Sequence, residues 1–301
     1  MSRHSGRDRS YGFHGVVACM AAVALTAGGC GGGGAGAGDG GGGGGRTGAV
    51  GGPPSSTAAG GPRGTAPGAT AAAWHKWGLK PLPAPPEPPA DKPVKLSATG
   101  TVPVLAHIPT PRKIVFITVD DGQEKDPRFI EMMRDLKVPI TMFLTNDAVK
   151  SDYAYFEPLR AMGNHIQNHT LHHPAMNTLP LARQKEEVCG GQKVLTERYG
   201  TAPLLFRPPY GAYDTGTRTA VGECGPRAIV WWRETMQIKN MQYQTADRKL
   251  RPGDIILAHF RGPSELKGTT MTRMFANLLR RIGEQGFAVA RLEDYIEAPA
   301  R

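Results

Sequence analysis

Hydrophobic and polar residues alternate in the carboxyl-terminal two thirds of the chain in a pattern that predicts strands followed by helices. Short runs of β-branched and aromatic residues predict seven strands, at Ile114–Val119, Ile140–Leu144, His165–Asn168, Leu204–Phe206, Ile229–Trp232, Ile255–His259 and Phe287–Ala290. Apolar stripes with helical spacing predict helices at Pro127–Leu136, Tyr153–Met162, Leu179–Tyr199, Asp214–Gly222 and Met271–Gln285. This alternation predicts an α/β fold in which parallel strands form a sheet or barrel. In such folds, chemistry collects at the carboxyl ends of the strands.

The first hundred residues have a different composition. Residues 28–70 consist mainly of Gly, Ala, Pro, Ser and Thr, which bury too little apolar surface to offset chain entropy. The segment Pro81–Pro93 is expected to be an extended polyproline spacer. We therefore predict an export segment at 1–30, a disordered Gly/Pro-rich tether at 31–94 and a folded domain at 95–298. Trp74 and Trp77 precede the spacer, where they either pack on the domain surface or contact a sugar.

The amino terminus resembles a bacterial export signal. Three arginines within the first nine residues precede an uncharged segment from Tyr11 to Ala27, which is short for a membrane span. The sequence Leu25-Thr26-Ala27-Gly28-Gly29-Cys30 is similar to a lipobox, with Cys30 as the lipid-bearing residue. Cleavage without lipidation and an incidental cysteine are the alternatives. In each case we expect an exported protein, either secreted or anchored to the extracellular face of the membrane by an amino-terminal lipid.

Charge and cysteine content narrow the function classes. The net charge is +10, but the residues after Thr110 carry only 27 Lys and Arg against 22 Asp and Glu. The folded part contains no cluster of Lys and Arg interleaved with aromatic residues, so the sequence does not indicate a nucleic-acid partner. The mild basic excess either attracts an acidic cell-wall polymer or is simply solvated. Cys189 and Cys224 lie in the folded part, and we predict that they form a disulfide in an exported protein.

Two adjacent carboxylates end the most apolar predicted strand. Asp120 and Asp121 follow Ile114–Val119 and precede Gly122. Two acidic side chains at the end of a buried strand are costly to desolvate unless a cation binds them. Asp-Gly is also a common turn dipeptide. The pattern therefore leaves open a turn and a metal or acid–base site.

A cluster of histidines follows the third predicted strand. His169 and His173 are four residues apart, so on a helical turn both imidazoles would project from the same face. Together with Asp121 they would form a three-ligand metal site with open positions for water. Histidines at strand ends also occur as turn and capping residues, which is the alternative.

Two further motifs also follow predicted strands. In Phe206–Gly211, tandem prolines fix the backbone, so the Tyr210 amide could be held towards a reacting centre while Arg207 binds a carboxylate with two hydrogen bonds. His259 ends another buried strand and could deliver a proton near neutral pH. Taken singly, a rigid Pro-Pro loop beside a strand is most often architectural, and a solitary histidine at a strand end is usually a structural residue.

In order and spacing, the four motifs resemble those of the polysaccharide deacetylase family, carbohydrate esterase family 4. The matching stretches are Thr118-Val119-Asp120-Asp121-Gly122, His169-Thr170-Leu171-His172-His173-Pro174, Arg207-Pro208-Pro209-Tyr210 and Leu257-Ala258-His259. They are similar to the family's Thr-Phe-Asp-Asp-Gly, His-Ser/Thr-x-x-x-His, Arg-x-Pro-Tyr and Leu-x-His motifs. The resemblance covers about residues 113–296 and implies a distorted (β/α) barrel with about seven parallel strands.

The resemblance implies a role for each site residue. Asp121, His169 and His173 would bind a divalent metal, usually Zn²⁺ and sometimes Co²⁺ or Ni²⁺. Asp120 would be the general base and Arg207 would orient it. The other roles that the resemblance implies are oxyanion binding by the Tyr210 amide, protonation of the departing amine by His259, and contacts with the substrate by Leu257, Tyr210 and Trp232.

The sequence departs from the family pattern near the fifth strand. Family members often carry an Asp and then an Asp-Trp pair there, whereas this chain reads Trp231-Trp232-Arg233-Glu234-Thr235-Met236. Glu234 could replace the Asp that holds the arginine, and Gln123 replaces a common proline. The function implied is removal of N-acetyl groups from an aminosugar polymer, peptidoglycan or chitin-like, at the cell surface. An O-acetyl esterase acting on acetylated xylan and a surface glycan-binding protein without turnover are the alternatives.

Overall fold

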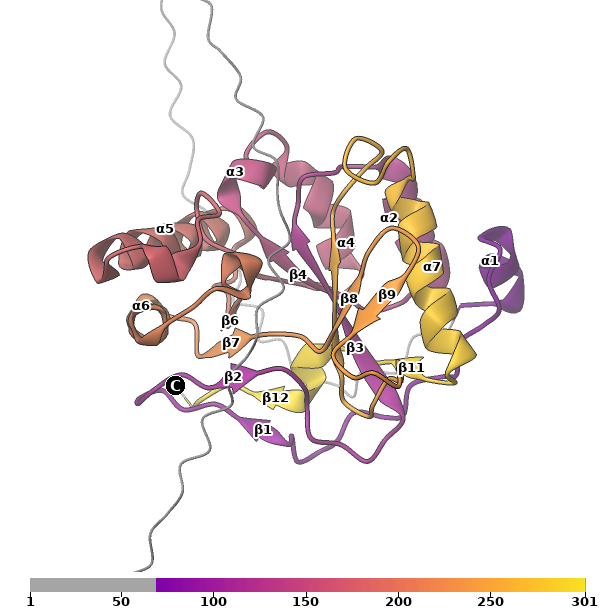
Figure 1. The fold of residues 1–301 in the computed structure, drawn as a ribbon, viewed down its shortest axis with the longest axis horizontal. Coiled ribbons are helices and arrows are strands. Elements are labelled where there is room, and N and C mark those ends of the chain that lie inside the picture. The colour runs from indigo at the N-terminus through magenta and orange to yellow at the C-terminus, as the bar shows by residue number, and fades with distance from the viewer. Residues whose placement is uncertain (1–68, 301) are drawn as a thin grey trace, which may run out of the picture. The chain divides into compact units, whose positions relative to one another are not determined.

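The computed structural model describes residues 69–300, and in this range a curled parallel sheet forms a half barrel (Figure 1). The strand order is β2-β7-β6-β5-β4-β3-β10-β8-β9, with β11 paired to the start of β3; only β9 pairs antiparallel. The strands of this sheet are β2 (Val104–Leu105), β3 (Ile114–Asp121), β4 (Thr141–Leu144), β5 (His165–Asn168), β6 (Leu205–Phe206), β7 (Ala228–Val230), β8 (Glu234–Met236), β9 (Met241–Tyr243), β10 (Ile255–His259) and β11 (Ala288–Val289). The predicted fold class is confirmed. All seven predicted strands are present and pair in parallel.

Helices cover the outer face of this sheet. They are α1 (Ala71–Lys76), α2 (Pro127–Leu136), α3 (Asn146–Val149), α4 (Glu157–Ala161), α5 (Leu181–Tyr199), α6 (Thr215–Cys224) and α7 (Met271–Glu284). The starts of α2 and α7 follow from local chemistry, since Asp126 and Thr270 accept hydrogen bonds from the first turns and Pro127 occupies the first helical position. A separate parallel pair, β1 (Val94–Lys95) and β12 (Ile296–Glu297), joins the segment before the barrel to the carboxyl-terminal end of the described range.

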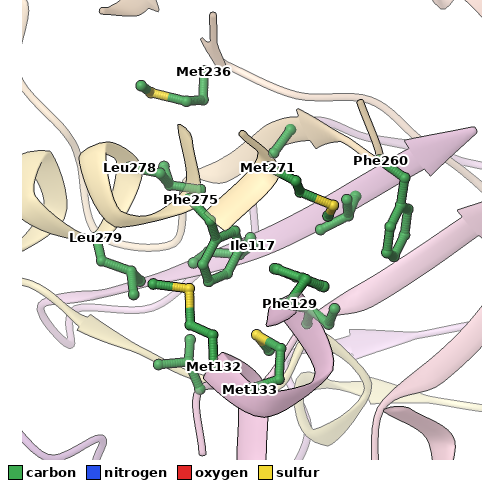
Figure 2. Packing of buried hydrophobic residues seen from close by; sticks show 14 of the residues in the cluster. Ile117, Phe129, Met132, Met133, Met236, Phe260, Met271, Phe275, Leu278 and Leu279 are labelled. Carbon is green, nitrogen blue, oxygen red and sulfur yellow. The ribbon is translucent and has the colours of Figure 1, made fainter. Parts of the chain in front are cut away.

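The main apolar core lies between β3 and the pair α2 and α7. Residues Val115, Ile117 and Val119 of β3 belong to this outer cluster, whereas Ile114 and Phe116 belong to a second cluster on the inner face. Figure 2 shows side chains of α2 and α7 packed around Ile117. The alternation of β3 therefore fixes which of its residues face the barrel interior, and Thr118 and Asp120 fall on that side.

Residues 69–94, the described part of the tether predicted at 31–94, belong to the fold. Trp74 of α1 is only 6% exposed and packs in the outer cluster. Its ring buries a large apolar surface, which the Gly/Pro-rich composition of the surrounding sequence did not indicate. Trp77 donates a hydrogen bond from Nε1 to Asp135 Oδ2 at 2.9 Å. Further along, Lys92 Nζ donates to the carbonyls of Glu293 and Ile296. Residues 69–94 thus pack on the domain, and packing is the outcome for both tryptophans.

Cys189 in α5 and Cys224 in α6 form a disulfide, with their Cα atoms 4.7 Å apart. This is the pairing predicted from the sequence, and it joins the two helices that cover β5, β6 and β7 (Figure 1). In the described range, none of the helices has the length and apolar character needed to cross a lipid bilayer. The predicted export segment 1–30, Cys30 and the tether up to residue 68 lie outside the described residues.

Candidate active site

Asp120 and Asp121 lie at the end of β3, where the backbone leaves the strand. Asp120 is buried, and like Phe116 and Thr118 of the same strand it faces the barrel interior. Asp121 has a left-handed backbone with φ of 73°, followed by Gly122 with φ of 90°. A Cβ atom at Gly122 would lie 2.4 Å from Val149 Cγ1, so only glycine fits there. The reversal that brings both carboxylates to one site begins at Asp121, one residue before the glycine.

Arg207, which follows β6, holds Asp120 inside the barrel. Its Nη1 donates hydrogen bonds to Asp120 Oδ1 and to Thr118 Oγ1, each at 2.7 Å. The Nε and Nη2 groups donate to the carbonyls of Val230 and Trp231 at 3.0 and 3.2 Å. Both charged side chains are almost fully buried, so the pair is shielded from water and fixed in orientation.

His169 and His173 converge on Asp121. Their Nε2 atoms lie 3.5 and 3.2 Å from Asp121 Oδ1, and one ligand atom from each of the three residues falls within 4.8 Å of the other two. The predicted helical turn is wrong: residues 169–173 form an irregular loop with left-handed Thr170 and His173. Because these two residues reverse the chain, the loop brings the imidazoles together without a helix, with ring centroids 4.9 Å apart.

The geometry of His169 fits a metal ligand. Its Nδ1 lies 2.7 Å from the carbonyl oxygen of Arg207, which accepts the Nδ1 proton, so Nε2, which faces Asp121, is the nitrogen that would bind a metal ion once it has lost its own proton. One carboxylate and two imidazoles form the donor set of a catalytic zinc site with open positions. These three residues are therefore suited to hold a divalent metal ion.

Charges within the cluster shift the pKa of its members. Burial alone would raise the pKa of Asp121, but hydrogen bonds from His169 and His173 and the nearby His259 hold it well below its usual range. Burial would likewise lower the pKa of His169, but the Asp120 and Asp121 carboxylates raise it. Asp121 is thus ionised at neutral pH, as a metal ligand must be.

The Pro-Pro-Tyr loop after Arg207 lies beside the cluster. Tyr210 has a left-handed backbone with φ of 60°, and its ring packs edge-on against His173 at 4.8 Å between centroids. The Tyr210 side chain is 65% exposed, so it faces the open side of the site. Trp231 anchors the loop by donating from Nε1 to the Gly211 carbonyl. Trp232 stacks on Trp231 and lies 5.5 Å from the Arg207 guanidinium carbon.

His259 and Leu257 complete the inner wall. In the register of β10 against β3, His259 is opposite Asp120 and Leu257 is opposite Thr118. Leu257 is buried one pleat below His259, where it forms an apolar floor. Burial lowers the pKa of His259 to about 4, although the Asp121 charge acts in the opposite direction. The imidazole is therefore neutral at pH 7 in this state.

The suggestion that Glu234 replaces the missing Asp beside the arginine is wrong. Glu234 is on the same side of β8 as Met236, which belongs to the outer cluster (Figure 2), so it points away from Arg207. Burial and the neighbouring Asp254 raise the pKa of Glu234 to about 8. The place of a carboxylate beside Arg207 is taken by the carbonyls of Val230 and Trp231.

The sequence did not single out three further residues around the site. Thr118 bridges strands, accepting from Arg207 and donating to the Ile256 carbonyl at 2.8 Å; its position two residues before Asp120 was the available signal. Glu187 of α5 accepts from His172 at Nδ1 and so holds that histidine away from the cluster. Arg261, two residues after His259, has Nη2 3.6 Å from Asp121 Oδ2, and nothing in its local pattern predicts this contact.

The half barrel and its Asp/His cluster define an α/β-barrel hydrolase with a candidate metal centre. Residues 107–229 match the family described as polysaccharide deacetylase. The chain belongs to this enzyme family, carbohydrate esterase family 4, as its four motifs indicated.

Relatives and solved structures agree with this assignment. An uncharacterised protein of Streptomyces coelicolor is 40% identical over 195 residues, covering 64% of this chain and 77% of that protein. A Bacillus cereus peptidoglycan-N-acetylglucosamine deacetylase is 24% identical, covering 67% of this chain and 96% of the enzyme. A solved family 4 carbohydrate esterase from Bacillus anthracis superposes with a TM-score of 0.52 and 22% identity, covering 64% of this chain and 86% of that one. The superposition supports the fold.

Proposed function

We propose that this protein is a metal-dependent deacetylase that hydrolyses the N-acetyl groups of an aminosugar polymer of the peptidoglycan or chitin type. One observation carries the proposal: the buried Arg207–Asp120 pair lies against the Asp121, His169 and His173 cluster, with Asp120 Oδ2 3.8 Å from His169 Nε2. The fold does not need a buried, oriented carboxylate at this position. A general base, in contrast, must be held in a fixed orientation next to the water that it deprotonates. Relatives named as peptidoglycan deacetylases support the substrate class.

Asp121, His169 and His173 would hold the metal, with Zn²⁺ as the first candidate and Co²⁺ or Ni²⁺ as alternatives. When bound, such an ion acidifies water and polarises the carbonyl of an acetamide. The chain supplies the three ligands already in place. The hydrogen bond from His169 Nδ1 to the Arg207 carbonyl leaves Nε2 as the nitrogen that binds the metal.

Asp120 would take the proton of the attacking water, because Arg207 holds and orients this carboxylate by a charge-assisted hydrogen bond. The Tyr210 amide, on the rigid Pro-Pro loop, would bind the oxygen on which negative charge develops. His259 is neutral at rest, so it must first take up the proton that Asp120 has removed from water, as the developing negative charge raises its pKa, and it would then give this proton to the leaving amine. Leu257 would bound the pocket for the acetyl methyl group, and Trp232 and Tyr210 would contact the sugar.

We propose that the protein acts outside the cytoplasm, as a lipoprotein through Cys30 or in secreted form. The basic and apolar amino terminus supports this location. The Cys189–Cys224 disulfide is also consistent with an oxidising compartment.

Acetate release tests the activity. Chitooligosaccharides, peptidoglycan and acetylated xylan are incubated with metal-loaded protein and with chelator-treated protein. We expect metal-dependent release from the N-acetylated glycans. Release from acetylated xylan alone would replace the proposal with an O-acetyl esterase. Glycan binding without release from any substrate would show a surface glycan-binding protein.

A further inference from the structure

Arg261 places beside the candidate site a cation that forms ion pairs with Asp121 and Glu265 but no side-chain hydrogen bond within the described residues. It lies two residues after His259 on the loop that leaves β10, and its side chain is 33% exposed. Nη2 is 3.6 Å from Asp121 Oδ2, and Nε is 3.6 Å from Glu265 Oε1. Both separations exceed hydrogen-bond length. Nε is buried and has no hydrogen-bond partner in the part of the chain that the structure describes.

The other cations that border the site are already engaged. Arg207 donates four hydrogen bonds and is fully buried. Lys125 Nζ donates to the carbonyls of Gly122, Gln123 and Ala148. Arg261 differs from both, because within residues 69–300 its guanidinium forms ion pairs at 3.6 Å but no hydrogen bond. The four N–H donors of its Nη1 and Nη2 groups, on a side chain that is partly open to solvent, are therefore available to a ligand.

The position of Arg261 also sets which part of a substrate it can reach. His169 and His173 contact Asp121 through Oδ1, whereas Arg261 approaches the other oxygen, Oδ2. The guanidinium thus lies next to the hydrolytic centre without occupying it. A group that it binds must be carried close to the reacting acetamide, on the same sugar or on the next ring of the strand.

We propose that Arg261 binds a carboxylate of the substrate and makes the enzyme selective for acidic aminosugar glycans, of the type in which N-acetylmuramic acid carries a lactyl carboxylate, over neutral chitin-like polymers. A guanidinium matches a carboxylate through two parallel hydrogen bonds, which neutral sugar hydroxyls cannot replace with the same strength. This inference rests on the proposed deacetylase function and adds the substituent that the site recognises.

The experiment compares two forms of one substrate. Peptide-free peptidoglycan glycan strands are used with their lactyl carboxylates free or methyl-esterified, and kcat and KM are measured for wild type, R261Q, R261K and R281Q. Arg281 is the matched control, because it is an exposed arginine at the far end of α7. Thermal unfolding verifies that each variant is folded.

We expect R261Q to raise KM for the free-acid strands about tenfold and to leave kcat nearly unchanged, as the loss of a charged hydrogen bond predicts. Its kinetics on the esterified strands should match those of wild type, R261K should fall between the two, and R281Q should have no effect. Equal loss on both substrate forms would overturn the proposal and make Arg261 a structural clamp on Asp121. So would a wild-type enzyme that does not distinguish acid from ester.

Binding separates this proposal from the deacetylase function. Calorimetry with metal-loaded D120N measures the affinity for free-acid and esterified strands without turnover. If wild type releases no acetate from any glycan, the deacetylase proposal fails. A tenfold preference for the free acid that disappears in D120N/R261Q would still support the carboxylate site, and equal affinity for both strands would refute it.

Discussion

Nη1 of Arg207 lies 2.7 Å from Oδ1 of Asp120, in a part of the barrel where both side chains are almost fully buried. Four hydrogen bonds hold the guanidinium, and it also covers the Phe143 ring at 4.3 Å from the ring centroid. A buried ion pair of this kind seldom adds net stability compared with apolar residues. We interpret it as a device that fixes the orientation of a base, with consequences for folding as well as for catalysis.

Removing one partner of this pair should cost more than removing both. R207M leaves the Asp120 carboxylate buried without its cation, and we expect the free energy of unfolding to fall by about 3–5 kcal/mol. In D120N/R207M no uncompensated charge remains, so at least about 1 kcal/mol should be recovered. Urea unfolding of wild type, D120N, R207M and the double variant measures these terms. A double variant less stable than R207M would contradict the buried-pair account.

Metal affinity should distinguish His173 from its neighbour. His173 faces Asp121, whereas His172 is held by Glu187 with Nδ1 2.8 Å from Oε1. We expect D121N and H173A to weaken Zn²⁺ binding by more than about 100-fold. Mutation of residues that only hydrogen-bond to metal ligands already lowers metal affinity by about 10–100-fold. H172A should bind within about twofold of wild type. Competition with a chromophoric chelator measures the affinities, and equal effects of H172A and H173A would rule out the ligand set.

Acid should destabilise the metal-free protein in two steps. The folded-state pKa of His259 is about 4, below the ordinary value of 6.5, so the unfolded chain binds its proton first and stability falls as the pH drops from 6.5 to 4. The full loss from this residue is at most about 3 kcal/mol. The pKa of Asp121 is also depressed, so its contribution is present above its ordinary pKa of 3.8 and is lost at still lower pH.

Urea unfolding in chelator at pH 7 and pH 4.5 measures the first step. H259Q lacks the titrating imidazole and should lose less stability between these values than wild type. An identical pH dependence in wild type and H259Q would show that burial of this histidine does not govern its protonation.

Residues 69–94 should be required for full stability. Trp74 is buried in the outer cluster, and we expect W74A to cost about 3–5 kcal/mol. A chain that begins at residue 95 should lose at least as much as W74A relative to one that begins at residue 69. Thermal and urea unfolding of the two truncated forms compare them directly. Equal stability would restore the view of this segment as a passive tether.

The barrel and much of the site could be predicted from the sequence because each motif ends an apolar strand. The run from Ile114 to Asp121 has the composition of a buried strand, and parallel pairing brings Asp120 and His259 to the same edge. The short strands β8 and β9 and the segment around Trp74 were missed. A strand of three residues is too short to show a recognisable alternation of apolar and polar positions. The burial of Trp74 could not be recognised because the sequence around it is rich in Gly and Pro.

Other features depend on contacts between segments far apart in the chain. The left-handed backbones of Asp121, Thr170, His173 and Tyr210 decide where the side chains meet, and only the surrounding packing imposes them. The outward direction of Glu234 follows from the register of β8, which its sequence does not define. The approach of Arg261 to Asp121 likewise arises from the path of the loop after β10.

The most direct test of the whole account measures metal binding and acetate release on the same samples. Metal-free wild type and D120N are titrated with Zn²⁺ while acetate release from peptidoglycan glycan strands is followed. We predict that both bind one ion per chain with comparable affinity. Activity in wild type should saturate at that ratio, and D120N should remain at least about 100-fold less active, because the base is lost while the ligands stay. Full activity in D120N, or activity in wild type that is independent of Zn²⁺, would contradict the division of roles between Asp120 and Asp121.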